Sequence, residues 1–239
     1  MIAESAPLRC LSVLVPIYNE RATVERLLRA VVAVETGLEL EVLACDDGST
    51  DGTRDILRNL TLPGLRVILL DRNVGRGGVL KHLWTIASGD VIIHQDADLE
   101  YAPDDYPALL APLRDGTADV VYGSRFKGSI ARMRWLNRMG NHTMSATARL
   151  LYGIEVSDLM TCYKLYRRSL VEGLRIEASG FDFEAEFTAR LAQRGARFAE
   201  VPIRFEGRTF EEGKKIRAFD AVRVMRELVR CKVAGERRG

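Results

Sequence analysis

The first 125 residues alternate between short β-rich apolar runs and segments with helical hydrophobic spacing, and this alternation constrains the fold most strongly. An apolar run over 10–16 precedes a helical pattern over 22–34, and a run over 38–45 precedes another over 51–60. Strand-then-helix units at this spacing need right-handed crossovers, which make the strands parallel. The sequence therefore predicts an α/β fold with a mostly parallel central sheet and helices on both faces.

The rest of the chain continues this pattern less regularly. It has no internal repeat or low-complexity linker, and its 47% hydrophobic content supplies a substantial core. We therefore expect a single domain over residues 1–239. Strands are predicted at 66–70, 91–95, 119–122 and 198–205, an extended segment at 158–166, and helices at 79–87, 103–114, 130–151, 184–194 and about 214–232, the last amphipathic and basic.

The apolar run that starts at Val91 breaks into Asp96-Ala97-Asp98, and Glu100 follows two residues later. Such a run is typical of a buried parallel strand, whose carboxyl end lies at the ligand-binding edge of an open α/β sheet. Because side chains alternate along an extended segment, the three carboxylates share one face and can reach one hard cation, such as Mg2+ or Mn2+. An ordinary polar turn at a strand end is the alternative.

Polar side chains also follow the neighbouring predicted strands. Tyr18 and Glu20 follow the first strand, and Asp46 and Asp47 follow the second. Carboxylates at adjoining strand ends can accept hydrogen bonds from a nucleobase or ribose, and a tyrosine can pack on the base. Helix capping is the alternative for the acids near residue 51. Arg125, one strand beyond the Asp pair, could neutralise a diphosphate or be an ordinary surface arginine.

The net charge of +2 conceals two basic segments. Residues 125–154 hold six basic and no acidic residues, and residues 204–239 hold eleven basic and six acidic ones. This segregation favours phosphates or an anionic membrane as partner. Nucleic acid is disfavoured, because the basic segments show neither a helix-turn-helix pattern nor interleaved stacking aromatics. The predicted helices at 130–151 and 214–232 could lie on a membrane surface or pack on the core.

The sequence shows neither a signal peptide nor a cysteine motif. Its four cysteines form no Cys-x-x-Cys pair, which argues against a zinc site and a disulfide framework and favours a reducing compartment. The first nine residues do not resemble a signal peptide, and no window approaches 18 uncharged apolar residues. We expect a soluble or peripheral membrane protein.

Taken together and in order, five motifs resemble the family 2 glycosyltransferases of the GT-A fold, the Rossmann-like fold of nucleotide-diphospho-sugar transferases. The resemblance covers about residues 10–220 and is greatest to dolichyl- or polyprenyl-phosphate mannosyltransferases. It implies an inverting, metal-dependent transfer of a hexose, preferably mannose from GDP-mannose, to a polyprenyl phosphate. The motifs are Val15-Pro16-Ile17-Tyr18-Asn19-Glu20, Asp46-Asp47-Gly48-Ser49-Thr50-Asp51-Gly52-Thr53, Asn73-x-Gly75-x-Gly77, Asp96-Ala97-Asp98-Leu99-Glu100 and Gly123-Ser124-Arg125-Phe126.

The resemblance also implies roles for individual residues. The metal would be bound by Asp96, Asp98 and Glu100. The late segment Arg208-x-x-x-x-Gly213-Lys214 matches a segment near the acceptor in this branch. The acceptor phosphate would therefore be bound by Arg138, Arg208 and Lys214. The nucleotide sugar would be bound by Pro16, Tyr18, Glu20, Asp46, Asp47, Asp96, Ala97 and Arg125.

The catalytic requirement depends on the acceptor, and the candidate catalytic residues are Asp98, Arg125, Asp182 and Glu184. A hydroxyl acceptor must lose a proton, and Asp182 or Glu184 is the candidate base. A lipid phosphate is already anionic, so arginines that align two phosphates matter more than a base. The alternatives are a family 2 enzyme that uses a UDP- or GDP-sugar and a soluble hydroxyl acceptor, and a non-catalytic nucleotide-sugar-binding subunit.

We expect the protein at the cytoplasmic face of a membrane. Many members of the branch carry carboxyl-terminal transmembrane helices, whereas residues 1–239 contain no such segment. Membrane contact would therefore use the basic helices of the chain or a membrane-anchoring partner protein.

Overall fold

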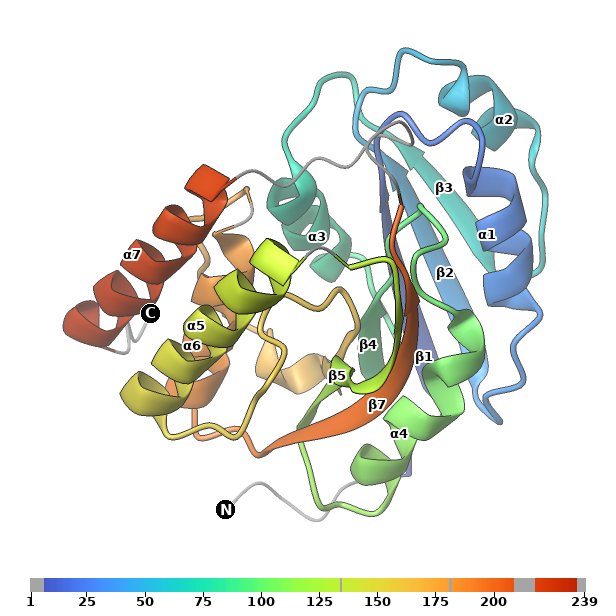
Figure 1. Cartoon of the computed structure of the whole chain (residues 1–239). Coiled ribbons are helices and arrows are strands. Elements are labelled where there is room, and N and C mark those ends of the chain that lie inside the picture. The colour runs from blue at the N-terminus through green and yellow to red at the C-terminus, as the bar shows by residue number, and fades with distance from the viewer. Residues whose placement is uncertain (1–6, 134, 181, 209–217, 236–239) are drawn as a thin grey trace.

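The computed structural model describes residues 7–133, 135–180, 182–208 and 218–235 (Figure 1). Its seven strands form one sheet in the order β3-β2-β1-β4-β6-β5-β7. The strands are β1 (Cys10–Ile17), β2 (Glu39–Asp46), β3 (Leu65–Leu69), β4 (Val91–His94), β5 (Val120–Ala131), β6 (Lys164–Arg167) and β7 (Phe198–Glu206). The helices are α1 (Val24–Val32), α2 (Thr53–Asn59), α3 (Arg76–Trp84), α4 (Tyr106–Arg114), α5 (Trp135–Tyr152), α6 (Phe183–Gln193) and α7 (Ala218–Ala234), with 3-10 turns at Pro103–Asp105 and Arg168–Leu170.

The strand order contains a reversal beside β1. Strands β3, β2, β1 and β4 are mutually parallel. The chain passes from β1 to β2 and β3 on one side, and β4 then lies on the other side of β1. Such a reversal is a topological switch point, and ligands bind at the carboxyl ends of the flanking strands. The polar segments that follow β1 and β4 therefore lie next to each other.

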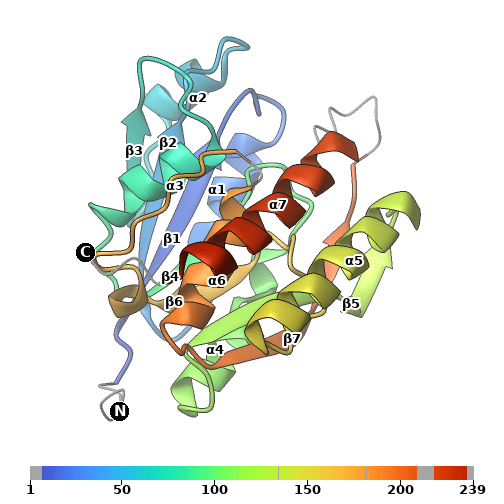
Figure 2. The same cartoon turned by 90° about the vertical axis from the view of Figure 1, so that its left-hand side faces the viewer.

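Two apolar layers cover the sheet, as the alternation of side chains along β1 requires. Val13 and Val15 belong to the cluster built with α1, α2 and α4. Leu14 and Leu43 belong to the cluster built with α3, α5, α6 and α7. Figure 2 shows α5 and α7 side by side over α6 on this second face. The predicted mostly parallel sheet with helices on both faces is confirmed.

Two segments differ from the predicted elements because pairing in the sheet decides them. The predicted helix over 130–151 begins only at Trp135, because β5 continues to Ala131 alongside β7, with an irregular register between Ser124 and Ser129. Of the predicted extended segment 158–166, only the end forms a strand, and this strand, β6, runs antiparallel to β4 and β5. The predicted helix at 214–232 corresponds to α7, and residues 214–217 lie outside the described residues.

Within the described part of the chain, every helix is too short or too polar to cross a bilayer.

Candidate active site

The loops after β1, β2 and β4 meet at the switch point. The backbone N–H of Asp47 donates to the carbonyl oxygen of Ile17, and that of Gln95 donates to the carbonyl oxygen of Leu14. Asn19, in a left-handed backbone conformation, accepts a hydrogen bond from the backbone N–H of Thr50 at 2.9 Å. These contacts fix the three strand ends relative to one another before any ligand binds.

A cluster of three carboxylates forms around one guanidinium at this edge; we call it the Arg208 cluster. It consists of Glu20 after β1, Asp98 and Glu100 after β4, and Arg208 after β7. Nη1 of Arg208 lies 2.9 Å from Glu20 Oε2, and Nη2 lies 2.9 Å from Asp98 Oδ2. The backbone N–H of Arg208 donates to Glu100 Oε1 at 2.7 Å. The structure thus joins four predicted site residues that are far apart in the sequence.

Among the described residues, the charge of this cluster is unbalanced, since three carboxylates surround one cation. Burial, followed by the negative charges of Asp96 and Glu100, raises the pKa of Asp98 to about 7, although Arg208 acts in the opposite direction. The side chains of Asp98 and Glu100 remain partly exposed. Carboxylate oxygens in excess of the available positive charge are a donor set that suits a hard divalent cation. The predicted metal ligands therefore fit such a cation.

Asp96 belongs to a second, balanced group, which we call the Arg76 network. Nε of Arg76 donates to Asp96 Oδ1 at 2.9 Å, and Nη1 of Arg76 donates to Glu184. The fully buried Lys164 of β6 also pairs with Glu184. Two carboxylates and two cations thus neutralise each other between β4, α3, β6 and α6.

A close approach of α3 to α6 makes the Arg76 network possible. Gly77 lies against Phe183, where a Cβ on residue 77 would come within 2.9 Å of the Phe183 side chain. The preceding Gly75 has a φ of 79°, and its backbone N–H donates to Asp47 Oδ2 at 3.0 Å. The glycines therefore place the first residue of α3, Arg76, between Asp96 and Glu184.

Arg76 and Lys164 were missed by the sequence reasoning, which used the Gly75 segment only as one of the five motifs of the resemblance. A lysine inside the run Tyr163-Lys164-Leu165-Tyr166 was the available signal, because a buried lysine needs an anionic partner.

The two candidate bases differ in their surroundings. Glu184 is buried, which would raise its pKa, but the charges of Lys164 and Arg76 outweigh this effect and the pKa lies below its usual range. Its carboxylate therefore serves as a charge partner in this structure. Asp182 is half-buried and precedes the first residue of α6.

Arg125 lies in a third arrangement, a buried pair with Asp158. Nε and Nη2 of Arg125 donate to the two Asp158 carboxylate oxygens, each at 2.7 Å, and Asn141 donates to the same carboxylate. The guanidinium also lies 5.0 Å from the ring centroid of Phe205. Asp158 was another residue that the sequence reasoning missed, since nothing local marks it as a partner of residue 125. Asp158 therefore occupies the Nε–Nη2 edge of the Arg125 guanidinium, and the Phe205 ring lies against its face.

The remaining predicted residues lie in several places. Arg138 is on the exposed side of α5, 5.7 Å from the ring centroid of Phe126, and Lys214 lies outside the described residues. Tyr18 is exposed, with 38% of its surface accessible, whereas Pro16 is half-buried in β1 and Ala97 is buried.

The two acids after β2 are both buried. Asp47 accepts hydrogen bonds from the backbone N–H groups of Val74 and Gly75, at 2.7 and 3.0 Å, and burial raises its pKa. Asp46 accepts from Gly48 and Ser49 through Oδ2. Its Oδ1 is buried and has no hydrogen-bond partner among the described residues. Asp46 thus retains an acceptor atom at the predicted nucleotide end of the site.

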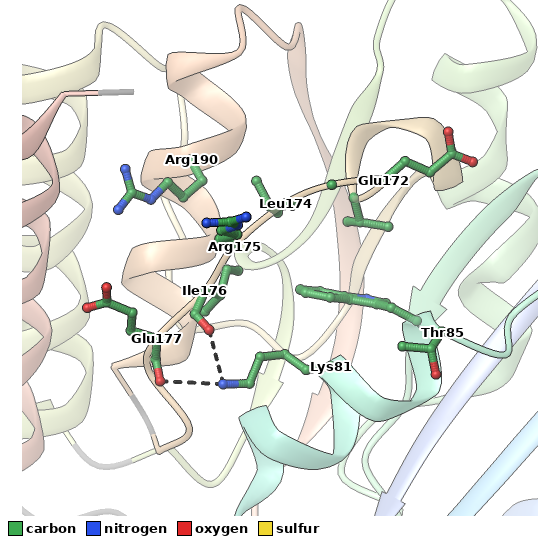
Figure 3. Close-up of a pocket in the computed structure, with 11 residues that line it drawn as sticks. Lys81, Thr85, Glu172, Leu174, Arg175, Ile176, Glu177 and Arg190 are labelled. Atoms are coloured by element: carbon green, nitrogen blue, oxygen red, sulfur yellow. Dashed lines mark hydrogen bonds between the residues drawn. The ribbon is translucent and has the colours of Figure 1, made fainter. Parts of the chain in front are cut away.

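A cavity of about 570 Å³ lies apart from these residues, between α3 and the segment 171–177 (Figure 3). Lys81 spans it and donates to the carbonyl oxygens of Ile176 and Ala178 at 3.1 and 3.0 Å. In its wall, Trp84 Nε1 donates to Tyr166 Oη at 2.7 Å, and the same oxygen lies 2.7 Å from His94 Nε2. None of the predicted site residues lines this cavity.

Comparison with known proteins identifies the family. The model of the family described as Glycosyl transferase family 2 matches residues 12–175. The chain belongs to glycosyl transferase family 2. The predicted glycosyltransferase class is therefore confirmed.

Two similar proteins carry names of the polyprenyl-phosphate mannosyltransferase branch that the sequence resembles. An undecaprenyl-phosphate mannosyltransferase of Micrococcus luteus is 33% identical over 215 residues, which cover 84% of this chain and 85% of that protein. A polyprenol monophosphomannose synthase of Mycolicibacterium smegmatis is 31% identical over 208 residues, covering 82% of this chain and 77% of that protein.

Solved structures establish the fold independently. A glucosyl-3-phosphoglycerate synthase from Mycobacterium tuberculosis, in complex with Mn2+, UDP and glucosyl-3-phosphoglycerate, has a TM-score of 0.70 and 22% identity, covering 94% of this chain and 80% of that chain. At this identity the likeness shows the fold, and the predicted GT-A fold is confirmed.

Proposed function

We propose that this family 2 glycosyltransferase is an inverting, divalent-metal-dependent enzyme that transfers a hexose to a polyprenyl phosphate, with GDP-mannose as the favoured donor. The names of the relatives from Micrococcus luteus and Mycolicibacterium smegmatis support the lipid phosphate and the mannose. The observation that carries the proposal is the crowding of Asp98 and Glu100 beside Arg208 at the switch point, which leaves an excess of carboxylates among the described residues.

That excess matches what a sugar diphosphate requires. Asp96, Asp98 and Glu100 would hold the cation through carboxylate oxygens, the ligands that Mg2+ and Mn2+ prefer. When bound, the cation would neutralise negative charge on the leaving nucleoside diphosphate. Glu20 would complete the negative rim of this site, since it shares the Arg208 guanidinium with Asp98.

The nucleotide would lie at the ends of β1 and β2. The exposed Tyr18 would pack on a base. Asp46 Oδ1, which has no hydrogen-bond partner among the described residues, would accept an N–H or hydroxyl group. The backbone beside these groups would come from Pro16, Asp47 and Ala97, which are buried or half-buried at the three adjoining strand ends. Guanine and uracil both offer N–H donors, so the assay must compare GDP- and UDP-sugars.

The state of Glu184 favours an acceptor that needs no base. Its carboxylate is neutralised by Lys164 and Arg76, whereas deprotonation of a hydroxyl would need a free carboxylate. A lipid phosphate attacks as an anion, and its approach to the diphosphate requires cations. Arg138, Arg208 and Lys214 would supply these cations. Arg125 would act as a positioning residue beside Glu100, because Asp158 holds its guanidinium.

The outer faces of α5 and α7 are suited to a peripheral contact with the membrane that contains such an acceptor. Trp135, Met139 and Leu150 are exposed along α5, and Val222 and Val233 along α7. The two helices contact each other, and the Tyr152 hydroxyl donates to the carbonyl oxygen of Leu228 at 2.7 Å. Exposed arginines lie on both helices or next to them, namely Arg132, Arg138, Arg223 and Arg226.

Apolar stripes flanked by arginines are a composition that binds anionic bilayers. Four free cysteines agree with the cytoplasmic face of that membrane. If the chain does not bind vesicles by itself, a membrane-anchoring partner protein would have to supply the contact.

The test is a transfer assay with labelled GDP-mannose, UDP-glucose and UDP-N-acetylglucosamine. Each donor is incubated with undecaprenyl phosphate in detergent and Mg2+ or Mn2+, and the label is followed into the organic phase. We expect label from GDP-mannose, lost with a chelator and with Asp98→Ala. The matched control is Asp104→Asn, which removes an exposed acid outside the Arg208 cluster.

The outcomes separate the parts of the proposal. Label from another donor corrects the sugar and keeps the lipid acceptor. Slow donor hydrolysis without lipid labelling contradicts the lipid acceptor and directs the search to soluble hydroxyl acceptors. Binding of nucleotide sugar without transfer or hydrolysis supports a non-catalytic subunit.

A further inference from the structure

We propose that Arg208 occupies the cation position of its carboxylate cluster in the free enzyme, so that the guanidinium and a divalent cation compete for the same carboxylates. This inference rests on the metal dependence proposed above. It adds a property of the free chain: an internal group holds the site ready for the metal and must move when the metal binds.

The contacts of Arg208 carry the first step of the argument. Its two terminal nitrogens bridge Glu20 and Asp98, which follow different strands, while its backbone N–H holds Glu100. Nε is buried without a hydrogen-bond partner, and Glu100 Oε1 is 4.0 Å away from it. The guanidinium therefore forms a bidentate pair with Glu20, since Nη2 also lies 3.1 Å from Glu20 Oε1, and it shares Nη2 with Asp98. A small cation bound to Asp98 and Glu100 would lie next to the same oxygens.

Charge supplies the second step. Asp98 and Glu100 place two carboxylates beside one guanidinium, and a divalent cation bound to them would neutralise negative charge that Arg208 alone does not. A guanidinium that kept its contacts would then lie beside that cation, and like charges at contact distance repel. Entry of the metal thus weakens the hold of Glu20 and Asp98 on Arg208.

The balanced Arg76 network provides the third step, because it shows what the Arg208 cluster lacks. Asp96 and Glu184 have two cations for two carboxylates, and Lys164 is fully buried among them. Arg76 contacts Asp96, one of the proposed ligands, through Oδ1 alone, and Lys164 pairs with Glu184 whether or not a cation binds nearby. Arg208 is partly exposed, with 20% of its side chain accessible, and can turn outward. Once released, its guanidinium becomes available to a phosphate oxygen.

The direct test measures Mn2+ binding without substrate, using the electron paramagnetic resonance signal of free Mn2+. We expect Arg208→Gln to bind Mn2+ at least tenfold more tightly than the wild type when no nucleotide is present. The matched control is Arg204→Gln, which removes an exposed arginine of β7 that pairs with Asp104 and Asp105. Asp98→Asn added to Arg208→Gln should abolish the gain, which locates the ion.

The outcomes distinguish this inference from the proposed function. One outcome is that the wild type binds Mn2+ in the presence of GDP while Arg208→Gln binds Mn2+ no more tightly than the wild type. That result overturns the competition and keeps the metal dependence. Absence of Mn2+ binding in every variant, with and without GDP, overturns both.

A second measurement uses the wild type and avoids any effect of a substitution on folding. Phenylglyoxal modifies accessible guanidinium groups, and peptide mass spectrometry reports the modification of each arginine. Mg2+ should speed the modification of Arg208 and leave that of Arg204 unchanged. A rate for Arg208 that Mg2+ leaves unchanged or lowers would contradict the release of the guanidinium.

Discussion

Arg125 and Arg208 both lie near the carboxyl ends of the strands, yet their surroundings are opposite. Arg125 is buried and shares two parallel hydrogen bonds with one carboxylate, that of Asp158. Arg208 is partly exposed and is shared among three carboxylates, those of Glu20, Asp98 and Glu100. A carboxylate that is fully paired with one guanidinium attracts little further positive charge. Several carboxylates that share one guanidinium still attract a cation. Charge balance therefore separates the buried Arg125–Asp158 pair from the Arg208 cluster.

We expect the largest effect from a substitution that breaks the pair of Arg125 and Asp158. Asp158→Asn keeps the shape of the side chain but leaves the Arg125 guanidinium buried without a counter-charge, which should lower the free energy of unfolding by about 3–5 kcal/mol. Thermal unfolding should report a Tm lower by roughly 10 °C. Asp104→Asn, at an exposed site, is the control and should change the stability by less than about 0.5 kcal/mol. A Tm like that of the wild type would mean that Arg125 finds water or another partner.

The matching substitution in the Arg208 cluster should lower the activity without lowering the stability. Asp98→Asn removes one of three crowded negative charges, so the Tm should stay the same or rise. Sugar transfer should fall about 100- to 1000-fold, because a group that stabilises developing charge is lost. Parallel measurement of Tm and kcat tests both expectations. Loss of stability with full activity would reverse the roles assigned to the two arginines.

His94 provides a test of the Arg76 network, whose cations lie close to it. Burial, and then the positive charges of Arg76 and Lys164, hold its pKa well below the usual range, so His94 is neutral in the folded protein. Below about pH 6.5 the unfolded chain binds a proton at this position and the folded chain does not. The free energy of unfolding should therefore fall with decreasing pH, by up to about 1.4 kcal/mol per pH unit.

Denaturant unfolding between pH 5 and 8 tests this expectation. The difference between the wild type and His94→Gln should be constant above about pH 7.5 and should shift against the wild type as the pH decreases. A difference that does not depend on pH would show that His94 can be protonated inside the fold.

The smallest expected effect concerns Arg138, an exposed arginine whose contact is the Phe126 ring. Arg138→Gln should weaken binding to vesicles with anionic lipid several-fold and leave the Tm unchanged, since a basic residue near a membrane contributes about 1 kcal/mol. Arg66→Gln, on the exposed surface of β3, is the matched control. Cosedimentation with vesicles measures the difference. Equal binding of both variants would remove Arg138 from the membrane face.

The sequence was sufficient for the parts of the site that local patterns encode. The loops after β1, β2 and β4 were predicted because an apolar run that ends in polar residues marks both the strand and its carboxyl end. The extension of β5 to Ala131 was not predicted, because its pairing with β7 lies in a segment about 75 residues later. The same holds for Arg76, Lys164 and Asp158, whose partners are distant in the sequence. The roles of the predicted residues in binding and transfer stay predictions.

The position of Arg208 late in the sequence also has a consequence for cotranslational folding. Strand β1, which precedes Glu20, and strand β4, which precedes Asp98 and Glu100, emerge from the ribosome long before residue 208 is synthesised. Until β7 joins the sheet, these acids have no guanidinium among them, and the antiparallel β6 that separates β4 from β5 also arrives late. Domains fold as units once their distant contacts can form. The nascent chain therefore completes the Arg208 cluster only after residue 208 has been synthesised.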